Sequence, residues 1–317
     1  MDTKIIPIIL CGGSGQRLLP FLKYSLPKQF LNIFYGRGNL LQNTLLRFNN
    51  KNIFNDPIIV SSFNYRTELV DSLKAIQCKT EALIFEQDGR NTGPAITSVI
   101  AYLTELGIKD NTMIVIIPID HYIADEKQFI KRLEYVAELL RNTQYQDKIM
   151  TLSVEKTATE ANYGHLKVGK KQSTKSLDSV YEVLDFIEKP EHEMSEQNIV
   201  WNSGIYCMSI KSCKNIIIKN SPHIWHYSYK AVTKGIQRTL NSSLNIELLL
   251  NNTFFSKNSK LSFDQILTMP YWPESLICTD IGTQWEDIGL WSGIKRLHHR
   301  NQHSVPIINS ELFAQQI

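Results

Sequence analysis

The chain has 317 residues, which is enough for one large α/β domain or two small domains with a buried core. Its composition, with 43% hydrophobic and 21% charged residues, is typical of a globular protein. The net charge is only +3, and the Lys and Arg residues are dispersed along the chain, so the charge argues against a general nucleic-acid-binding protein.

The first predicted element lies in the stretch "IILCGGSGQR", which begins at residue 8 with an apolar run and continues with glycines. The run predicts a buried strand, and Gly12, Gly13 and Gly15 predict a sharp turn with exposed backbone N–H groups that can cradle an anion. Arg17 and Lys28 would add a bidentate donor and a point charge, so we expect the anion to be a polyphosphate. The alternative is an ordinary strand-to-loop turn with solvated basic residues. The GxxxxGKS/T motif is absent, and the glycines do not have GxGxxG spacing.

Further strands and helices are predicted to alternate along the chain. The strands cover 57–62, 81–87 and 112–120, and the amphipathic helices lie near 39–50, 64–76, 91–107 and 126–142. In the last helix, Phe129, Leu133, Val136 and Leu140 form one apolar stripe. This alternation predicts βαβ units and a largely parallel sheet. Ligands of such sheets bind beyond the carboxyl ends of the strands, where the glycine turn and Asp120 would both lie.

After about residue 150 the pattern changes to shorter strands, at 148–154, 163–169, 181–189 and 203–210. We therefore expect an α/β fold with a Rossmann-like, mostly parallel sheet covered by helices. The later strands would form an inserted antiparallel extension that roofs the same cleft. Residues 1–295 would form this domain and residues 296–317 a C-terminal tail.

The cysteines and the N-terminus indicate the cellular compartment. The five cysteines form no CxxC pair, and four of them lie in apolar or strand-like segments, as free thiols in a reducing compartment do. The apolar run before the first glycines is too short for a secretory signal, and nothing approaches the length of a membrane span. We therefore expect a soluble cytoplasmic protein that contacts neither membranes nor nucleic acid.

Six short stretches, in order over residues 6 to 291, are more specific. They are "GGSGQRLLP…PKQF", "GRNTGPA" (89–95), "PIDH" (118–121), "FIEKP" (186–190), "WNSGIY" (201–206) and "WEDIGLW" (285–291). Together they resemble the sugar-1-phosphate nucleotidyltransferases, and most closely the mannose-1-phosphate guanylyltransferases of the bacterial type. Each stretch alone is a weak signal, whereas the ordered set is specific.

The resemblance implies a reaction and a role for each matching residue. The reaction is nucleotidyl transfer from GTP to mannose 1-phosphate, which gives pyrophosphate and GDP-mannose for polysaccharide biosynthesis. The implied catalytic residues are Arg17, Lys28, Asp120 and Lys189. The implied nucleotide-binding residues are Gly12, Gly13, Ser14, Gly15, Arg17, Lys28, Arg90 and Asn91. The implied sugar-binding residues are Gly164, Glu188, Lys189 and Asn202, and the implied Mg²⁺ ligands are Asp120 and Asp287.

Several of these residues also have a simpler interpretation. Asp120 could be a helix N-cap after a strand, and Asp287 could be a turn aspartate before a glycine. Glu188 and Lys189 could be a solvated surface pair, and Asn202 could cap a turn. These interpretations do not explain why the residues lie inside family-like stretches.

The chain also departs from the family pattern near the expected sugar pocket. Asn162 and His165 replace the glycine and tyrosine of the family's TGYGYI segment, although we expect His165 to be a plain strand histidine. The stretch at 261–270 keeps Asp264 but loses the family's Glu–Lys end at 268–270. Two alternatives therefore stay open: the same chemistry with UTP, dTTP or another hexose phosphate, and a noncatalytic sugar-nucleotide sensor. A homodimer is also open.

Overall fold

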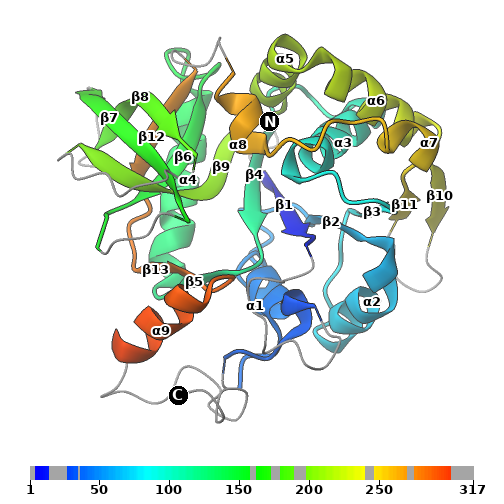
Figure 1. The fold of residues 1–317 in the computed structure, drawn as a ribbon, viewed down its shortest axis with the longest axis horizontal. Coiled ribbons are helices and arrows are strands. Elements are labelled where there is room, and N and C mark those ends of the chain that lie inside the picture. Colours follow the sequence, from blue (N-terminus) through cyan, green and yellow to red (C-terminus); the bar gives the residue numbers. More distant parts are fainter. Residues whose placement is uncertain are drawn as a thin grey trace.

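The computed structural model describes residues 4–13, 27–34, 36–157, 162–172, 179–188, 198–239, 246–269 and 275–300. In these ranges, eleven strands form one mixed sheet with helices on both faces (Figure 1). In their order across the sheet the strands are β10 (Ile236–Thr239), β11 (Ile246–Leu249), β3 (Ala82–Glu86), β2 (Ile58–Ser62), β1 (Ile5–Cys11), β4 (Met113–Pro118), β9 (Ile199–Ser209), β6 (Ile149–Val154), β12 (Leu276–Asp280), β8 (Val180–Ile187) and β7 (Gly164–Gln172).

The strands from β11 to β4 form a parallel half of the sheet. Strands β1 to β4 are apolar and almost completely buried, because helices cover both of their faces. Their order β3-β2-β1-β4 reverses direction between β1 and β4, which is the place where doubly wound sheets bind ligands. The strands predicted at 57–62, 81–87 and 112–120 are confirmed.

The other half of the sheet is mainly antiparallel. Strand β9 runs antiparallel to both β4 and β6, and β7 and β8 form an antiparallel pair because no helix separates them in the chain. Only β6 and β12 pair in parallel here. The expectation of a mostly parallel sheet is therefore wrong for the whole sheet, although it is right for the half from β11 to β4. The later strands extend this sheet sideways from β4. That they roof the cleft stays a prediction.

Two apolar cores lie on opposite faces of the sheet. One face is covered by α1 (Leu40–Leu46), α2 (Arg66–Ala75), α4 (Glu126–Arg141) and α9 (Trp291–Arg300). The other face is covered by α3 (Thr92–Glu105), α5 (Ile210–Asn220), α6 (Pro222–Thr233), α7 (Asn252–Phe255) and α8 (Phe263–Leu267). Two short 3₁₀ helices are η2 (Lys28–Phe30) and η3 (Phe63–Tyr65). The four helices predicted in the first half are confirmed, and the predicted stripe of α4 is buried.

A small second sheet pairs β5 (His121–Ile123) with β13 (Trp285–Asp287), and α9 follows β13 (Figure 1). A Cβ at Gly293 of α9 would lie 1.9 Å from the carbonyl oxygen of Asp287, so only glycine allows this close packing. The predicted domain boundary after residue 295 falls inside α9, and residues 301–317 lie outside the described ranges. The division into domain and tail therefore stays a prediction.

The five cysteines are all free, and four are buried. Burial raises the pKa of the Cys11 thiol to about 12, so this residue packs as a small hydrophobic side chain. Among the helices of the described ranges, none has the length and hydropathy needed to cross a membrane.

Candidate functional site

A cavity of about 480 Å³ opens where the parallel strands end. The ends of β1, β2, β3 and β4 and the start of α3 contribute its walls, as expected for a sheet of this order. The lining residues are Leu10, Gly12, Gly13, Lys28, Val60, Glu86, Gly89, Asn91, Thr92, Ala95, Pro118, Ile119, Asp120 and Lys260. The structure thus brings together five of the residues expected to bind nucleotide or metal: Gly12, Gly13, Lys28, Asn91 and Asp120.

The glycine turn begins directly after β1, as the sequence predicts. Gly13 has φ +91°, a backbone conformation that residues other than glycine rarely adopt. A Cβ added at Gly12 or Gly13 would have no atom of the described residues within 4 Å. The turn is therefore open toward the cavity. The remaining expected members, Ser14, Gly15 and Arg17, lie outside the described ranges.

Lys28 and Asp120 form an ion pair at the edge of the cavity. Helix η2 carries Lys28, and the turn between β4 and β5 carries Asp120. Their side chains are only 18% and 14% exposed. Burial opposes ionisation of Asp120, but Lys28 and neighbouring groups outweigh it and hold the pKa of this carboxyl below its usual value. Asp120 is therefore ionised at neutral pH.

Asp287 reaches the same place through the small sheet. The pairing of β5 with β13 sets Asp287 opposite His121, and the Ile288 amide donates to the carbonyl oxygen of Asp120 at 2.9 Å. A Cβ at Gly289 would lie 2.1 Å from Oδ2 of Asp120, 3.0 Å from Oδ1 of Asp287 and 3.0 Å from Nζ of Lys28. These three charged groups therefore converge on Gly289, and we call Lys28, Asp120, Asp287 and Gly289 the Asp120 cluster.

The two simpler interpretations of these aspartates have different outcomes. The N-cap of α4 is Asp125, whose side chain accepts from the Gln128 amide, so Asp120 is not a helix cap. Asp287 does act as a turn aspartate, because its Oδ1 accepts from the Gly289 amide at 2.8 Å. This bond does not use the second carboxylate oxygen of Asp287.

The Asp120 cluster fits a divalent cation that shares substrate oxygens. The described ranges contain no group of three or more His, Cys, Asp or Glu side chains that could hold a metal by themselves. Two convergent carboxylates at the mouth of a cavity nevertheless match Mg²⁺, which usually takes one or two carboxylates and completes its shell with water and phosphate oxygens. A cation there would compete with Lys28 for Asp120.

A second polar group of residues lies where the sugar was expected, and we call Thr151, Asn202, Tyr206 and Asp264 the Asn202 cluster. The amide oxygen of Asn202 accepts from Thr151 Oγ1 at 2.6 Å, and its Nδ2 donates to Tyr206 Oη at 2.8 Å and Asp264 Oδ1 at 3.1 Å. Tyr206 Oη also donates to Asp264 Oδ1 at 2.5 Å. Burial and the Asp264 carboxylate raise the pKa of Tyr206 well above its usual value. The polar atoms of this cluster are thus largely occupied within the protein.

The expected sugar-binding residues lie around the Asn202 cluster. Gly164 of β7 pairs with Asn202 of β9, and a Cβ at Gly164 would lie 3.1 Å from the Phe186 ring. Glu188 follows β8 and acts electrostatically on Tyr206, so it lies near this cluster. Lys189 lies outside the described ranges. The sugar-binding roles of these residues stay predictions.

Other expected or altered residues are placed less centrally. Arg90 does not line the cavity, whereas its neighbour Asn91 does and also caps α3 by accepting from the Thr92 amide. His165 is buried within β7 with Nδ1 3.0 Å from the Tyr163 carbonyl oxygen, which agrees with a plain strand histidine.

Glu86, the last residue of β3, is a site residue that no sequence motif pointed to. Glu86 lines the cavity, is only 7% exposed, and its Oε1 has no hydrogen-bond partner among the described residues. Burial raises its pKa to about 8, so the carboxyl is mostly protonated at neutral pH. The signal that could have revealed it is an acidic residue directly after the apolar run "ALIF" at the carboxyl end of a predicted strand.

A second missed network fixes β13. Arg296 of α9 donates from Nη2 to Glu286 Oε1 at 2.7 Å and to Tyr163 Oη at 2.7 Å, and Glu286 is buried next to Asp287. This network ties the strand that carries Asp287 to the segment that precedes Gly164. The Asp120 cluster and the expected sugar side of the site are therefore joined by these hydrogen bonds.

Comparison with known proteins gives a consistent result. A family model described as "Nucleotidyl transferase" matches residues 6–303. A mannose-1-phosphate guanylyltransferase from Salmonella muenchen is 26% identical over 98% of this chain and 63% of its own length. The mannose-1-phosphate guanylyltransferase RfbM from Salmonella typhimurium is 28% identical over 98% of this chain and 62% of its own length. The chain thus spans about three-fifths of the length of these curated relatives.

A solved structure shares the fold. It is described as mannose-1-phosphate geranyltransferase from Thermus thermophilus, and it has a TM-score of 0.73 at 20% identity over 93% of this chain and 79% of that chain. Together with the family model, these matches confirm the resemblance carried by the six sequence stretches. The chain therefore belongs to the nucleotidyl transferase family.

Proposed function

We propose that this protein transfers a guanylyl group from GTP to mannose 1-phosphate, giving GDP-mannose and pyrophosphate. The observation that carries the proposal is the cavity itself, which combines a glycine turn and the Asp120 cluster with a buried carboxyl at Glu86 whose Oε1 has no hydrogen-bond partner among the described residues. The first two features suit a triphosphate, and the third suits a base with two adjacent hydrogen-bond donors. The names of the curated relatives support the same substrates.

The chemistry at the phosphate end requires alignment and charge neutralisation. An oxygen of the sugar phosphate would attack the α-phosphorus of GTP while the bond to the bridging oxygen of the β-phosphate breaks, so that pyrophosphate leaves. No general base is needed, since the attacking phosphate is already an anion at neutral pH. We propose that the amides at Gly12 and Gly13, together with Lys28 and Arg17, bind the triphosphate.

We propose Mg²⁺ as the cofactor, held by Asp120 and Asp287. When bound, the cation would neutralise part of the charge on the two phosphate groups that must approach each other. The protein's own contribution is to bring the two carboxylates close to Gly289, where a Cβ would collide with Asp120 Oδ2.

Glu86 supports guanine as the base. Guanine presents a ring N–H and an exocyclic amino group side by side, and one carboxylate can accept from both. Uracil and thymine present a single ring N–H between two carbonyl groups, so an ionised Glu86 would have only one donor to accept from and would face a carbonyl oxygen. The preference for guanine therefore belongs to the ionised form of Glu86. Because Glu86 is mostly protonated in the empty cavity, guanine binding would release its proton at neutral pH.

We propose that the sugar phosphate lies on the side of the Asn202 cluster, next to Gly164, Glu188 and Lys189. The Arg296 network that joins Tyr163 to β13 supports this placement, because it holds this side against the strand that carries Asp287. We further propose a cytoplasmic location and a homodimer.

The deciding experiment is a coupled assay for pyrophosphate with mannose 1-phosphate and each of four NTPs, repeated with glucose 1-phosphate. We expect GTP with mannose 1-phosphate to give the highest kcat/KM. A clear preference for UTP or dTTP would contradict the guanylyl assignment and favour another sugar-1-phosphate nucleotidyltransferase. An isothermal titration in buffers of different ionisation enthalpy should detect a proton released when GTP binds.

The second candidate is a noncatalytic sugar-nucleotide sensor, favoured by two observations. The Asn202 cluster is already hydrogen-bonded within the protein, and the neighbouring stretch at 261–270 departs from the family pattern. A sensor would bind GDP-mannose tightly but release no pyrophosphate with Mg²⁺ and both substrates. Turnover in that assay would exclude it.

A further inference from the structure

We propose that Thr44 and Arg47, at the end of α1, are positioning residues that hold the Asp120 turn in its catalytic geometry. The inference rests on the proposed function, because it concerns the placement of the carboxylate that this function requires. Neither residue lines the cavity, and neither lies in the six family-like stretches.

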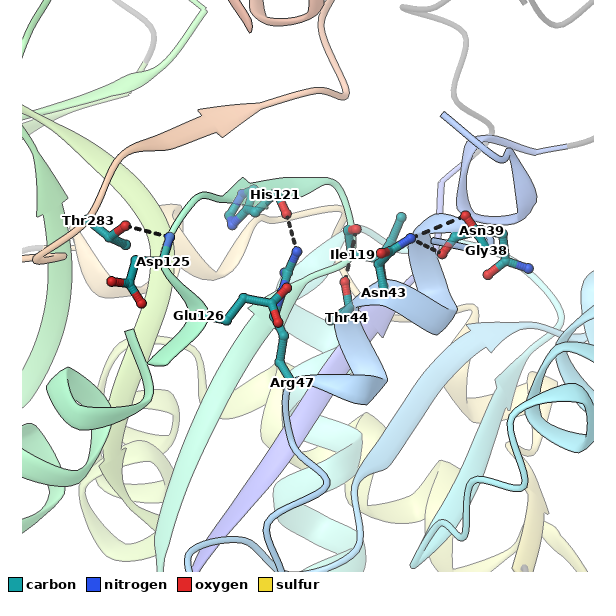
Figure 2. Close-up of polar contacts among 10 residues, drawn as sticks. All are labelled: Gly38, Asn39, Asn43, Thr44, Arg47, Ile119, His121, Asp125, Glu126 and Thr283. Atoms are coloured by element: carbon teal, nitrogen blue, oxygen red, sulfur yellow. Dashed lines mark hydrogen bonds and ion pairs between the residues drawn. The ribbon is translucent and has the colours of Figure 1, made fainter. Parts of the chain in front are cut away.

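Three consecutive carbonyl oxygens around Asp120 are each held by a different donor. Thr44 Oγ1 donates to the Ile119 carbonyl at 3.2 Å, and the Ile288 amide donates to the Asp120 carbonyl at 2.9 Å. Arg47 Nη2 donates to the His121 carbonyl at 3.1 Å. Figure 2 shows the side chains of Thr44 and Arg47 pointing from α1 to the backbone on the two sides of this turn.

Burying the charged side chain of Arg47 at this position is unfavourable for the free energy of folding, so packing alone does not explain it. Arg47 is 8% exposed, and burial lowers its pKa, which shows that the environment disfavours its charge. Its Nε donates to Glu126 Oε1 at 3.2 Å, in the first turn of α4. One guanidinium thus joins the end of α1, the start of β5 and the start of α4 (Figure 2).

Helix α1 is itself well fixed, so it can serve as a support. Asn39 and Gln42 form a capping box at its start. Asn39 Nδ2 donates to Ser72 Oγ at 2.9 Å, and Gln42 Nε2 donates to the Ser72 carbonyl at 3.0 Å, which ties α1 to α2. Asn43 Nδ2 donates back to the Asn39 carbonyl at 2.8 Å (Figure 2).

The same helix also packs against η2, which carries Lys28. Helix α1 therefore supports both members of the Lys28–Asp120 ion pair. It packs against the helix that carries Lys28, and its side chains donate hydrogen bonds to the backbone on both sides of Asp120. Fixing the backbone matters because a displacement of a reacting group by about 1 Å can lower the rate by about 100-fold. Loss of either donor should therefore reduce turnover without removing any group that touches substrate.

The test uses the full chain and variants that differ in what they remove. Arg47→Met removes both donors, Arg47→Lys keeps the charge but loses the forked geometry, and Glu126→Gln weakens only the bond to α4. Thr44→Val removes the hydroxyl that donates to the Ile119 carbonyl, whereas Thr44→Ser keeps a hydroxyl at this position. Arg66→Met is the matched control, because Arg66 of α2 forms a similar ion pair with the buried Glu247 at 2.8 Å but does not approach the Asp120 turn.

Two readouts separate positioning from simple destabilisation. The first is kcat and KM for GTP, for which we expect Arg47→Met and Thr44→Val to lower kcat by about 10-fold to 100-fold with little change in KM. The second is hydrogen exchange of the Ile288 amide in the absence of nucleotide, which should speed up in these two variants relative to their global stability. Thr44→Ser should restore most of both values, and Arg47→Lys and Glu126→Gln should give intermediate values. Arg66→Met should change neither.

Several results would overturn the proposal. One is a wild-type kcat and wild-type Ile288 exchange in Arg47→Met and Thr44→Val, and another is equal changes in Arg66→Met. If Arg47→Met does not fold, Arg47→Lys and Thr44→Val decide the question. Failure of the proposed function is distinguishable, because it would be seen as absent pyrophosphate release in the wild type, whereas the Ile288 exchange tests the positioning without any substrate.

Discussion

The Asp120 cluster lies beyond the end of β4, next to the small sheet, and the Asn202 cluster is built around β6 and β9 of the large sheet; the two are organised in opposite ways. In the Asp120 cluster, charged groups converge on a glycine beside a cavity, and nearby Glu86 has an oxygen without a partner among the described residues. In the Asn202 cluster, polar atoms already bond to one another inside the protein. The first arrangement leaves polar groups facing the cavity, whereas the second pairs its polar atoms within the protein.

This contrast follows from the topology of the sheet. The parallel strands β1 and β4 end at the point where the strand order reverses, so their loops leave a space lined by backbone and charge. The antiparallel strand β9 instead passes between β4 and β6, where its side chains are covered on both faces and must be paired. Substitutions in the two clusters should therefore affect different quantities, activity in one and stability in the other.

The largest expected effect is that of Asp120→Asn and Asp287→Asn. Each change keeps the shape of the side chain but removes a charge that the proposed Mg²⁺ needs, so kcat should fall by about 100-fold to 1000-fold or more. Raised Mg²⁺ should restore activity only partly. The measurement is pyrophosphate release against Mg²⁺ concentration, with thermal melting as the control for folding. A wild-type rate and metal dependence in both variants would exclude the two carboxylates as ligands.

A somewhat smaller loss is expected for Lys28→Ala. Removing this cation takes away a contact to a reacting phosphate, which should cost about 2–4 kcal/mol of transition-state stabilisation. The pKa of Asp120 should also rise, because the main attraction that lowers it is gone. Arg17→Ala is expected to act in the same direction. Steady-state kinetics with GTP measure the effect, and an unchanged kcat/KM in either variant would remove that residue from the site.

Glu86→Gln should alter base selectivity and the pH dependence of stability. The kcat/KM ratio of GTP over UTP should fall by about 10-fold, since the amide presents one donor and one acceptor in place of two acceptors. A ratio equal to that of the wild type would contradict guanine recognition by Glu86.

The pH effect of Glu86 has a definite sign. Its pKa is raised in the folded protein from 4.5 to about 8, so the folded state holds this proton more tightly than the unfolded chain. The resulting stabilisation is complete below pH 4.5 and is lost as the pH rises through 8. Urea unfolding at several pH values should show a smaller decrease in Glu86→Gln than in the wild type. Parallel curves for the two proteins would contradict the raised pKa.

The smallest effect on activity is expected in the Asn202 cluster. Tyr206→Phe removes a hydroxyl that bonds to Asp264 and Asn202, which should lower the free energy of unfolding by about 1–2 kcal/mol. The value of kcat should change by less than about threefold. Tyr102→Phe is the matched control, because the Tyr102 hydroxyl is buried with no partner among the described residues and its removal should cost nothing. A large loss of kcat in Tyr206→Phe would place this cluster in the chemistry.

The sequence predicts the parts of this molecule that depend on local patterns. The apolar runs of β1 to β4, the glycine turn and the stripe of α4 follow from periodicity and turn chemistry. Asp120, Lys28 and Asp287 are found because they lie in ordered family-like stretches. Local patterns and the family-like stretches thus identify the glycine turn and the charged residues of the Asp120 cluster.

The remaining features depend on contacts between distant segments. Insertion of β9 between β4 and β6 is decided by how the whole sheet assembles, and no local pattern encodes it. The pairing of Asp287 with His121 is likewise tertiary. Arg47 looks like any basic residue at the end of a helix, and only the fold shows that its guanidinium is buried against the Asp120 turn.

The central claim is that the cavity between the glycine turn and the Asp120 cluster carries out nucleotidyl transfer. Its most direct test is to incubate the wild-type protein with GTP, mannose 1-phosphate and Mg²⁺ and to quantify both products over time. We expect pyrophosphate and GDP-mannose to appear in equal amounts, only when the sugar phosphate is present, and we expect a chelator to stop the formation of both. Tight binding of GDP-mannose without pyrophosphate, or pyrophosphate formed without the sugar phosphate, would contradict it.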